Sequence, residues 1–155
     1  MTPRSVISMS DIIIRKAIAD DADVLSVIEH ECFTDPWETP YFQGLLANPA
    51  VYFAIAEKDG VPVAFGGMTV VVDECDIINV AVSKAVRRLG IGRAMVGHLL
   101  EICKDHGVTS AFLEHRQSNT AAAALYESFG FEPYATRKKY YSSPTEDAIL
   151  RKLTL

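Results

Sequence analysis

The hydrophobic and polar positions of this chain follow two periods, one typical of strands and one typical of helices. Stretches rich in β-branched and aromatic residues predict strands, because such side chains fit a pleated, half-buried surface. Apolar residues spaced three and four apart predict amphipathic helices. The predicted strands are residues 11–16, 51–57, 61–72, 75–82, 108–114, 131–141 and 146–155, and the predicted helices are residues 24–32, 38–47, 93–106 and 120–129.

Turn residues divide these elements into two parts. Lys58-Asp59-Gly60 predicts a hairpin, and Gly66-Gly67 predicts a bulge or bend within a long strand. The strands up to residue 82 are therefore expected to be antiparallel neighbours, whereas the later strands alternate with helices. The order β-α-α-β-β-β-α-β-α-β-β predicts an α/β fold with a mixed sheet and helices on both faces.

Composition and charge narrow the class of protein. The 155 residues are 49% hydrophobic and 23% charged, which fits one folded domain over residues 11–155, preceded by a flexible segment at residues 1–10. The formal charge of −5 disfavours a nucleic-acid partner. Apolar runs are far shorter than the ~20 residues of a membrane span, and the chain starts without the apolar core of a signal peptide. We therefore expect a cytoplasmic protein with no nucleic-acid or membrane partner.

The cysteines predict neither a disulfide framework nor a metal site. Cys32, Cys75 and Cys103 are odd in number and widely spaced, and no C-x-x-C pair is present. No metal is therefore expected.

A glycine-rich turn follows the strand at residues 75–82 and reads Arg87-Arg88-Leu89-Gly90-Ile91-Gly92. Glycines let a ligand approach the main chain closely, and the start of the next helix offers free N–H groups to a phosphate. The P-loop spacing and its lysine are absent, and Met95 occupies the third glycine position of the dinucleotide fingerprint. On the turn alone, a plain strand-to-helix connection and a pyrophosphate-binding loop both stay open.

The turn and its surroundings resemble a known family. The pattern R-R-x-G-x-G between an apolar strand and an amphipathic helix resembles the acetyl-CoA motif of the GNAT N-acetyltransferases, and the element order is similar to that fold. Residues 33–37 (FTDPW), 112–119 (FLEHRQSN), 124–131 (ALYESFGF) and Tyr140-Tyr141 resemble the ribosomal-protein-alanine N-acetyltransferases, the RimI group. The resemblance implies acetyl-CoA-dependent acetylation of a protein N-terminus, namely the N-terminal alanine of the eighteenth small-subunit ribosomal protein.

The resemblance also implies two catalytic residues. Glu114 corresponds to the family's proton acceptor and Tyr126 to its proton donor to the leaving thiolate. From the residues alone, Glu114 fits a solvated carboxylate at a strand end, and Tyr126 fits a core aromatic that shares a helix face with Ala122 and Phe129. His115 departs from the small aliphatic residue common in the group, and it should alternate away from Glu114.

The acetyl-CoA site implied by the resemblance is built mainly from main-chain groups. Asn79, Val80, Ala81 and Val82 would offer N–H and C=O groups where their strand splays from the next one, and the glycine-rich turn would hold the pyrophosphate. Asn119 could cap its helix, bind acetyl-CoA, or do both, and capping is the usual role of Asn at a helix start.

Two other functions stay open from the sequence. One is a GNAT enzyme acting on lysine side chains or a small polyamine, with Trp37, Tyr140 and Tyr141 lining a different acceptor pocket. The other is a non-catalytic acetyl-CoA-sensing module. An α-amine with a pKa near 7.7–8.0 demands less of a base than a lysine at ~10.4, and the negative charge suits a basic protein tail. We expect a monomer or weak dimer.

Overall fold

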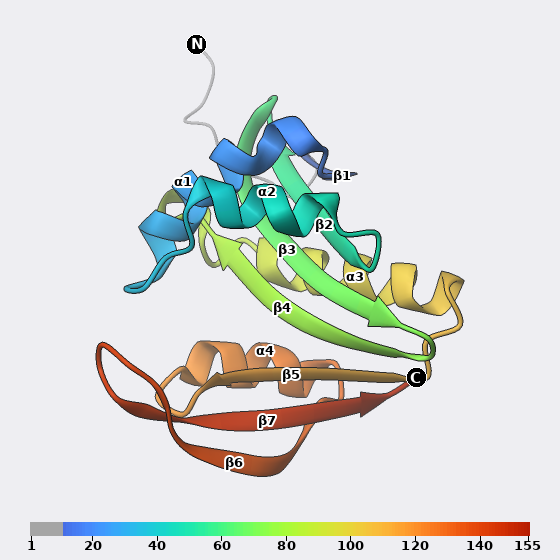
Figure 1. Cartoon of the computed structure of the whole chain (residues 1–155), viewed down its shortest axis with the longest axis vertical. Coiled ribbons are helices and arrows are strands. Elements are labelled where there is room, and N and C mark those ends of the chain that lie inside the picture. Colours follow the sequence, from blue (N-terminus) through green and yellow to red (C-terminus); the bar gives the residue numbers. More distant parts are fainter. Residues whose placement is uncertain (1–10) are drawn as a thin grey trace.

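The computed structural model describes residues 11–155 as a seven-stranded sheet with helices packed on it (Figure 1). The strands are β1 (Ile12–Lys16), β2 (Val51–Lys58), β3 (Val61–Val71), β4 (Glu74–Val82), β5 (Ser110–Arg116), β6 (Glu132–Tyr141) and β7 (Glu146–Thr154). The helices are α1 (Ala22–Cys32), α2 (Thr39–Ala47), α3 (Ile91–Asp105) and α4 (Thr120–Ser128). The expected flexible segment at residues 1–10 lies outside the described residues. Over the described part of the chain, no helix is long and apolar enough to cross a membrane.

The sheet is mixed, as the element order predicts. Its strand order is β1-β2-β3-β4-β5-β7-β6, in which β4 and β5 are parallel and every other neighbouring pair is antiparallel. The predicted hairpin is confirmed, since Asp59 and Gly60 both have positive φ (52° and 79°), as a tight two-residue turn requires. The predicted bulge is confirmed by a register shift between Gly67 and Met68.

Helices cover both faces of the sheet, which confirms the predicted layers (Figure 1). On one face, Phe53 and Ile55 of β2 are buried with Phe42 of α2. On the other face, the intervening Ala54 is buried with Met95 of α3. This alternation follows from the two-residue period of a strand, so β2 can be apolar on both sides because both of its faces are covered.

The strands β4 and β5 diverge in the middle of the sheet. They pair only where Glu74–Asp76 meets Ser110–Phe112, whereas β4 continues to pair with β3 up to Val82. Figure 1 shows the two strands separating beyond this short pairing. The splay that the family resemblance implies is therefore present, and within residues 11–155 no strand pairs with the β5-facing edge of β4 beyond Asp76.

Four predicted boundaries are wrong by two residues: α1 begins at Ala22 rather than residue 24, α3 begins early, and β5 both begins and ends late. α3 begins at Ile91 rather than residue 93, because Gly90 takes a left-handed conformation (φ 84°) and its carbonyl already accepts the Ala94 N–H at 3.0 Å. β5 begins at Ser110 rather than residue 108, because the Val108 N–H closes the preceding helix on Cys103. Because β5 continues to Arg116, Glu114 is inside the strand rather than at its last position.

Candidate active site

Two cavities meet where β4 and β5 diverge. One has a volume of about 470 Å³ and includes residues of α2 and β6, and the other has a volume of about 720 Å³ and includes residues of α1 and α4. The side chains that line both are Trp37, Ile77, Ile78, Leu113, Glu114 and Tyr140. The 470 Å³ cavity is called the smaller cavity below, and the 720 Å³ cavity is called the larger cavity. Glu114 is the carboxylate that both cavities share.

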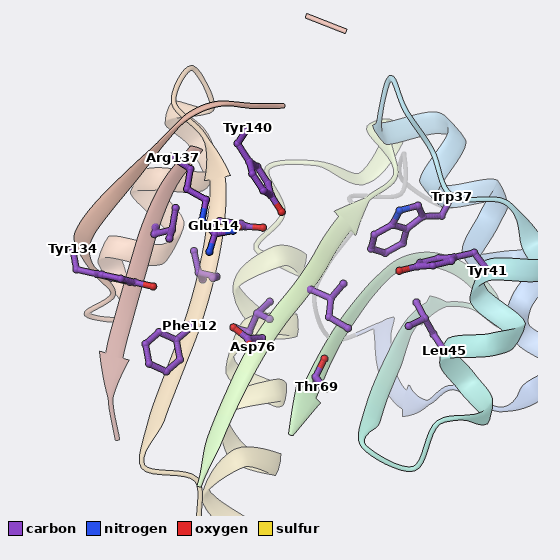
Figure 2. Close-up of a pocket in the computed structure, with 14 residues that line it drawn as sticks. Trp37, Tyr41, Leu45, Thr69, Asp76, Phe112, Glu114, Tyr134, Arg137 and Tyr140 are labelled. Carbon is purple, nitrogen blue, oxygen red and sulfur yellow. The ribbon is translucent and has the colours of Figure 1, made fainter. Parts of the chain in front are cut away.

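Glu114 lies among polar partners on the C-terminal strands. Its side chain is 33% exposed, and its Oε2 is 3.9 Å from Nη1 of Arg137 on β6. A hydrogen bond to the Glu114 carboxylate raises the pKa of Tyr140 above its usual value. Figure 2 shows Glu114, Arg137 and Tyr140 gathered at one end of the smaller cavity. The carboxylate is thus held between a cation and a phenol, and is more than a solvated strand-end group.

A second carboxylate faces the smaller cavity. Asp76 on β4 pairs in register with Phe112, which is two residues before Glu114 on β5. Partial burial, and then the nearby Glu114 carboxylate, raise the pKa of Asp76. The aromatic rings of Trp37 and Tyr41 face these groups from the opposite wall (Figure 2). The cavity therefore combines an aromatic wall with two carboxylates, which suits an amine-bearing ligand.

Tyr126 is both a core residue and a cavity residue. It is 8% exposed, packs edge-on against Phe131 and lines the larger cavity but not the smaller one. Burial raises the pKa of Tyr126 to about 12. Its phenol therefore keeps its proton at neutral pH and can donate it.

His115 alternates away from Glu114, as predicted. It is buried, with its ring centroid 6.1 Å from that of Tyr126. Its Nε2 accepts a hydrogen bond from Arg151 Nε at 2.8 Å, and its Nδ1 donates to the Arg116 carbonyl at 2.8 Å. These partners fix the orientation of the ring, which lines the larger cavity together with Tyr126.

The predicted acetyl-CoA residues divide into two groups. Asn79, Val80 and Asn119 line the larger cavity with Tyr126. Asn119 caps α4, because its Oδ1 accepts the Ala122 N–H at 3.0 Å. The remaining predicted residues lie beyond the lining of both cavities, and they are Ala81, Val82, Arg87, Arg88, Leu89, Gly90, Ile91 and Gly92.

The family model described as the acetyltransferase (GNAT) family matches residues 22–131. The chain belongs to the GNAT acetyltransferase family. GNAT acetyltransferases use acetyl-CoA, so this GNAT enzyme is an acetyl-CoA-dependent acetyltransferase.

Relatives and solved structures agree with that membership. The [ribosomal protein bS18]-alanine N-acetyltransferase of Escherichia coli K12 is 36% identical over 130 residues, covering 83% of this chain and 87% of that protein. The crystal structure of the ribosomal-protein-S18-alanine N-acetyltransferase from Escherichia coli has a TM-score of 0.87 at 33% identity and covers 92% of this chain and 93% of that one. Arabidopsis thaliana NAA60 in complex with acetyl-CoA, at 17% identity and a TM-score of 0.83, has the same fold; this chain aligns over 93% of its length and 98% of that chain.

The glycine-rich turn of this GNAT enzyme leaves main-chain groups open at the start of α3. Gly90 has a φ of 84°, and a Cβ built there would meet no atom within 4 Å, so the main chain is open to a ligand. The first N–H groups of α3 follow directly, and such groups favour a phosphate. Arg87 anchors the turn, because its Nε donates to the Val82 carbonyl at 2.9 Å. Arg93 is in the first turn of α3, and its guanidinium donates to Ser128 Oγ of α4 at 2.9 Å.

Two residues of the GNAT site escaped the sequence interpretation. Arg137 is the first of three consecutive basic residues (137–139), a charge run that is usually solvated, yet it lines the smaller cavity beside Glu114. Glu29 is 3% exposed and lines the larger cavity, where its carboxylate accepts hydrogen bonds from Asn79 and Trp37. A signal for Glu29 exists in the sequence, since it falls on the buried face of α1 with Leu25, where a charged residue is unusual.

Proposed function

We propose that this acetyltransferase transfers the acetyl group of acetyl-CoA to the α-amine of a protein N-terminus, namely the N-terminal alanine of the ribosomal protein bS18. The names of its relatives at 33–36% identity support that acceptor. The observation that carries the proposal is the place of Glu114 on the lining of both cavities. A base at that junction can serve an amine in the smaller cavity while the thioester lies in the larger one.

Glu114 would accept the proton of the attacking amine, directly or through water. At pH 7 about a tenth of an α-amine with a pKa of 7.7–8.0 is already neutral, so the base need only complete the deprotonation. A positioned general base contributes about 10²–10⁴ in rate. The negative charges of Asp76 and Glu114 would draw the ammonium form into the smaller cavity.

Tyr126 would donate its phenolic proton to the departing CoA thiolate. Its raised pKa keeps that proton in place until the sulfur becomes negative. A main-chain N–H within Asn79–Val82, on the edge of β4 that β5 leaves unpaired, would stabilise the carbonyl oxygen, and such a donor is worth about 2.7–4 kcal/mol in a transition state. Asn119 would face the same ligand from its helix cap, and Arg87–Gly92 would hold the pyrophosphate.

The wider assignments stay predictions. They are a single domain over residues 11–155, a cytoplasmic location, a monomeric or weakly dimeric state, and the absence of nucleic-acid and membrane partners.

CoA thiol release with two short peptides of matched composition tests the acceptor. One peptide carries a free N-terminal alanine and no lysine, and the other has a blocked N-terminus and an internal lysine. Release with the first alone is the expected result. Release with the second alone would replace the proposed acceptor with a lysine side chain. No CoA release with either peptide, despite acetyl-CoA binding, would contradict the proposed acceptor and favour a small-amine acceptor or an acetyl-CoA sensor.

A further inference from the structure

We propose that Glu29 is a positioning residue that ties the acceptor-side wall at Trp37 to strand β4 at Asn79. The inference rests on the proposed function in one respect, because its kinetic test uses an N-terminal alanine peptide as the acceptor. Its spectroscopic test is independent of any acceptor.

The carboxylate of Glu29 has one partner on each side. Its Oε1 accepts a hydrogen bond from Asn79 Nδ2 at 2.7 Å, and its Oε2 accepts the Trp37 main-chain N–H at 3.2 Å. Burial raises the pKa of Glu29, while these two donors lower it. A buried carboxylate is costly unless hydrogen bonds satisfy it, so this one is held by its two contacts.

The Trp37 peptide is fastened to α1 at both ends. While Glu29 takes its N–H, the Trp37 carbonyl accepts a hydrogen bond from Ser26 Oγ at 3.2 Å. His30 Nε2 lies 2.9 Å from Glu38 Oε1, next along the same segment. The connection between α1 and α2 is therefore clamped on the helix at consecutive residues, and the clamp fixes the indole that walls the smaller cavity (Figure 2).

The other contact of Glu29 reaches the strand that would carry the acetyl group. Asn79 follows Ile77 and Ile78, which line both cavities, and it belongs to the edge of β4 that β5 leaves unpaired. One carboxylate thus sets the distance between the acceptor wall and the proposed oxyanion-binding main chain. Loss of this link should disturb where the amine sits before it disturbs acetyl-CoA binding.

Four variants separate positioning from general stability. Glu29→Met removes both acceptor oxygens at similar side-chain length. Glu29→Gln keeps an oxygen for Trp37 and an amide that can pair with a reoriented Asn79. Asn79→Asp sets two carboxylates against each other, and adding Glu29→Gln to it restores a donor–acceptor pair. Glu31→Gln is the control, because Glu31 is an exposed carboxylate of the same helix that also accepts a main-chain N–H, from Lys84, outside both cavities.

Steady-state kinetics on the full chain give the first readout. We expect Glu29→Met and Asn79→Asp each to raise the acceptor KM about tenfold and to raise the acetyl-CoA KM by less than that. Glu29→Gln should raise the acceptor KM less than Glu29→Met does, and the double variant should recover most of the loss seen with Asn79→Asp, whereas general losses of stability would add together in the double variant.

Fluorescence gives the second readout, because Trp37 is the single tryptophan of the chain. Glu29→Met should red-shift its emission as the segment leaves α1, and the double variant should return it to the wild-type position. The inference is overturned if Glu29→Met leaves both emission and acceptor KM unchanged, or if the double variant is no better than Asn79→Asp. If the wild-type enzyme does not acetylate the alanine peptide but the Trp37 emission of the variants changes as expected, the acceptor assignment is wrong and the positioning role of Glu29 is supported.

Discussion

The two parts of the sheet on either side of the β4–β5 divergence bring different things to the site. The N-terminal part, β1 to β4, is a continuous antiparallel set whose interior is apolar, with Phe53 and Phe65 fully buried. The C-terminal part carries the side chains proposed to transfer protons, Glu114 on β5 and Tyr126 on α4, together with Arg137 on β6. The first part supplies a rigid frame and main-chain donors. Changes in the apolar core of the first part should therefore alter stability, and changes at Glu114 and Tyr126 should alter turnover.

The largest expected effect tests the C-terminal part at Glu114. Glu114→Gln keeps the size of the side chain but removes the base, so kcat/KM should fall about 10²–10⁴-fold while acetyl-CoA binding and the melting temperature stay near wild type. CoA-release kinetics and thermal unfolding measure both. Glu74→Gln is the matched control, since Glu74 is an exposed carboxylate of β4 outside both cavities. Equal losses of kcat/KM in Glu114→Gln and Glu74→Gln would contradict the assignment of catalysis to the C-terminal part.

Tyr126→Phe should have the next largest effect. It retains the ring packed on Phe131 and removes the proton donor, so kcat should fall about 10²-fold. The pKa of about 12 also predicts that the phenol of wild type stays protonated up to pH 10, so its ionisation should cause no fall in kcat there. A kcat profile from pH 7 to 10 checks this, and a decline that disappears in Tyr126→Phe would contradict it.

Two adjacent glycines sharpen the comparison on the N-terminal side. A Cβ on Gly67 would lie 2.2 Å from the ring of Phe53, which is locked in the core, whereas a Cβ on Gly66 would lie 2.6 Å from the flexible side chain of Met95. We expect Gly67→Ala to lower the free energy of unfolding by about 3 kcal/mol and Gly66→Ala by about 1 kcal/mol. Urea denaturation measures both, and the reverse order would show that Phe53 yields more easily than Met95.

A smaller effect than that of Gly67→Ala is expected at the start of α1. Asp21 accepts two hydrogen bonds from Arg15, at 2.8 and 2.9 Å, and one from the Ile18 N–H at 2.7 Å. The bond to Arg15 is the main reason that the pKa of Asp21 is lowered. Asp21→Asn should therefore cost about 1–2 kcal/mol of unfolding free energy at neutral pH.

The sign of the pH dependence follows from that lowered pKa. The contribution of Asp21 is fully present above its unfolded pKa of about 3.9 and is lost as pH falls through the folded value. The stabilities of wild type and Asp21→Asn should therefore converge as the pH falls below about 3.9 and through the lowered pKa of the folded state. A gap that persists in acid, seen by denaturation at several pH values, would assign the effect to packing instead of charge.

Local sequence patterns predicted most of the fold because its elements are encoded locally. The hairpin at Asp59-Gly60, the bulge at Gly67 and the cap at Asn119 all depend on residues next to one another in the chain. The start of α3 is harder to predict from the sequence. The left-handed backbone conformation of Gly90 begins that helix, and the apolar period of the helix is clear only later.

Contacts between distant residues account for what the patterns missed. Glu29 and Asn79 are 50 residues apart in the chain, and no local pattern in either segment predicts their hydrogen bond. Arg137 on β6 and Glu114 on β5 meet across the intervening strand β7, a strand order that no local period encodes. Family resemblance therefore predicts Glu114 and Tyr126 from the sequence. It does not identify the residues that contact the site from distant parts of the chain, such as Glu29 and Arg137.

The parting of β4 and β5 also has a thermodynamic consequence. A sheet normally has free edges only at its rims, whereas this one has two further edges in its middle, beyond Asp76 and Phe112. Those inner edges face the larger cavity between residues of α1 and α4, where a slender ligand can take the place of a strand. A ligand that binds only the folded protein adds about 2.7 kcal/mol to its unfolding free energy at about 100 times its Kd. Acetyl-CoA should therefore stabilise the folded enzyme as well as donate the acetyl group, and the free energy of unfolding should rise with the acetyl-CoA concentration.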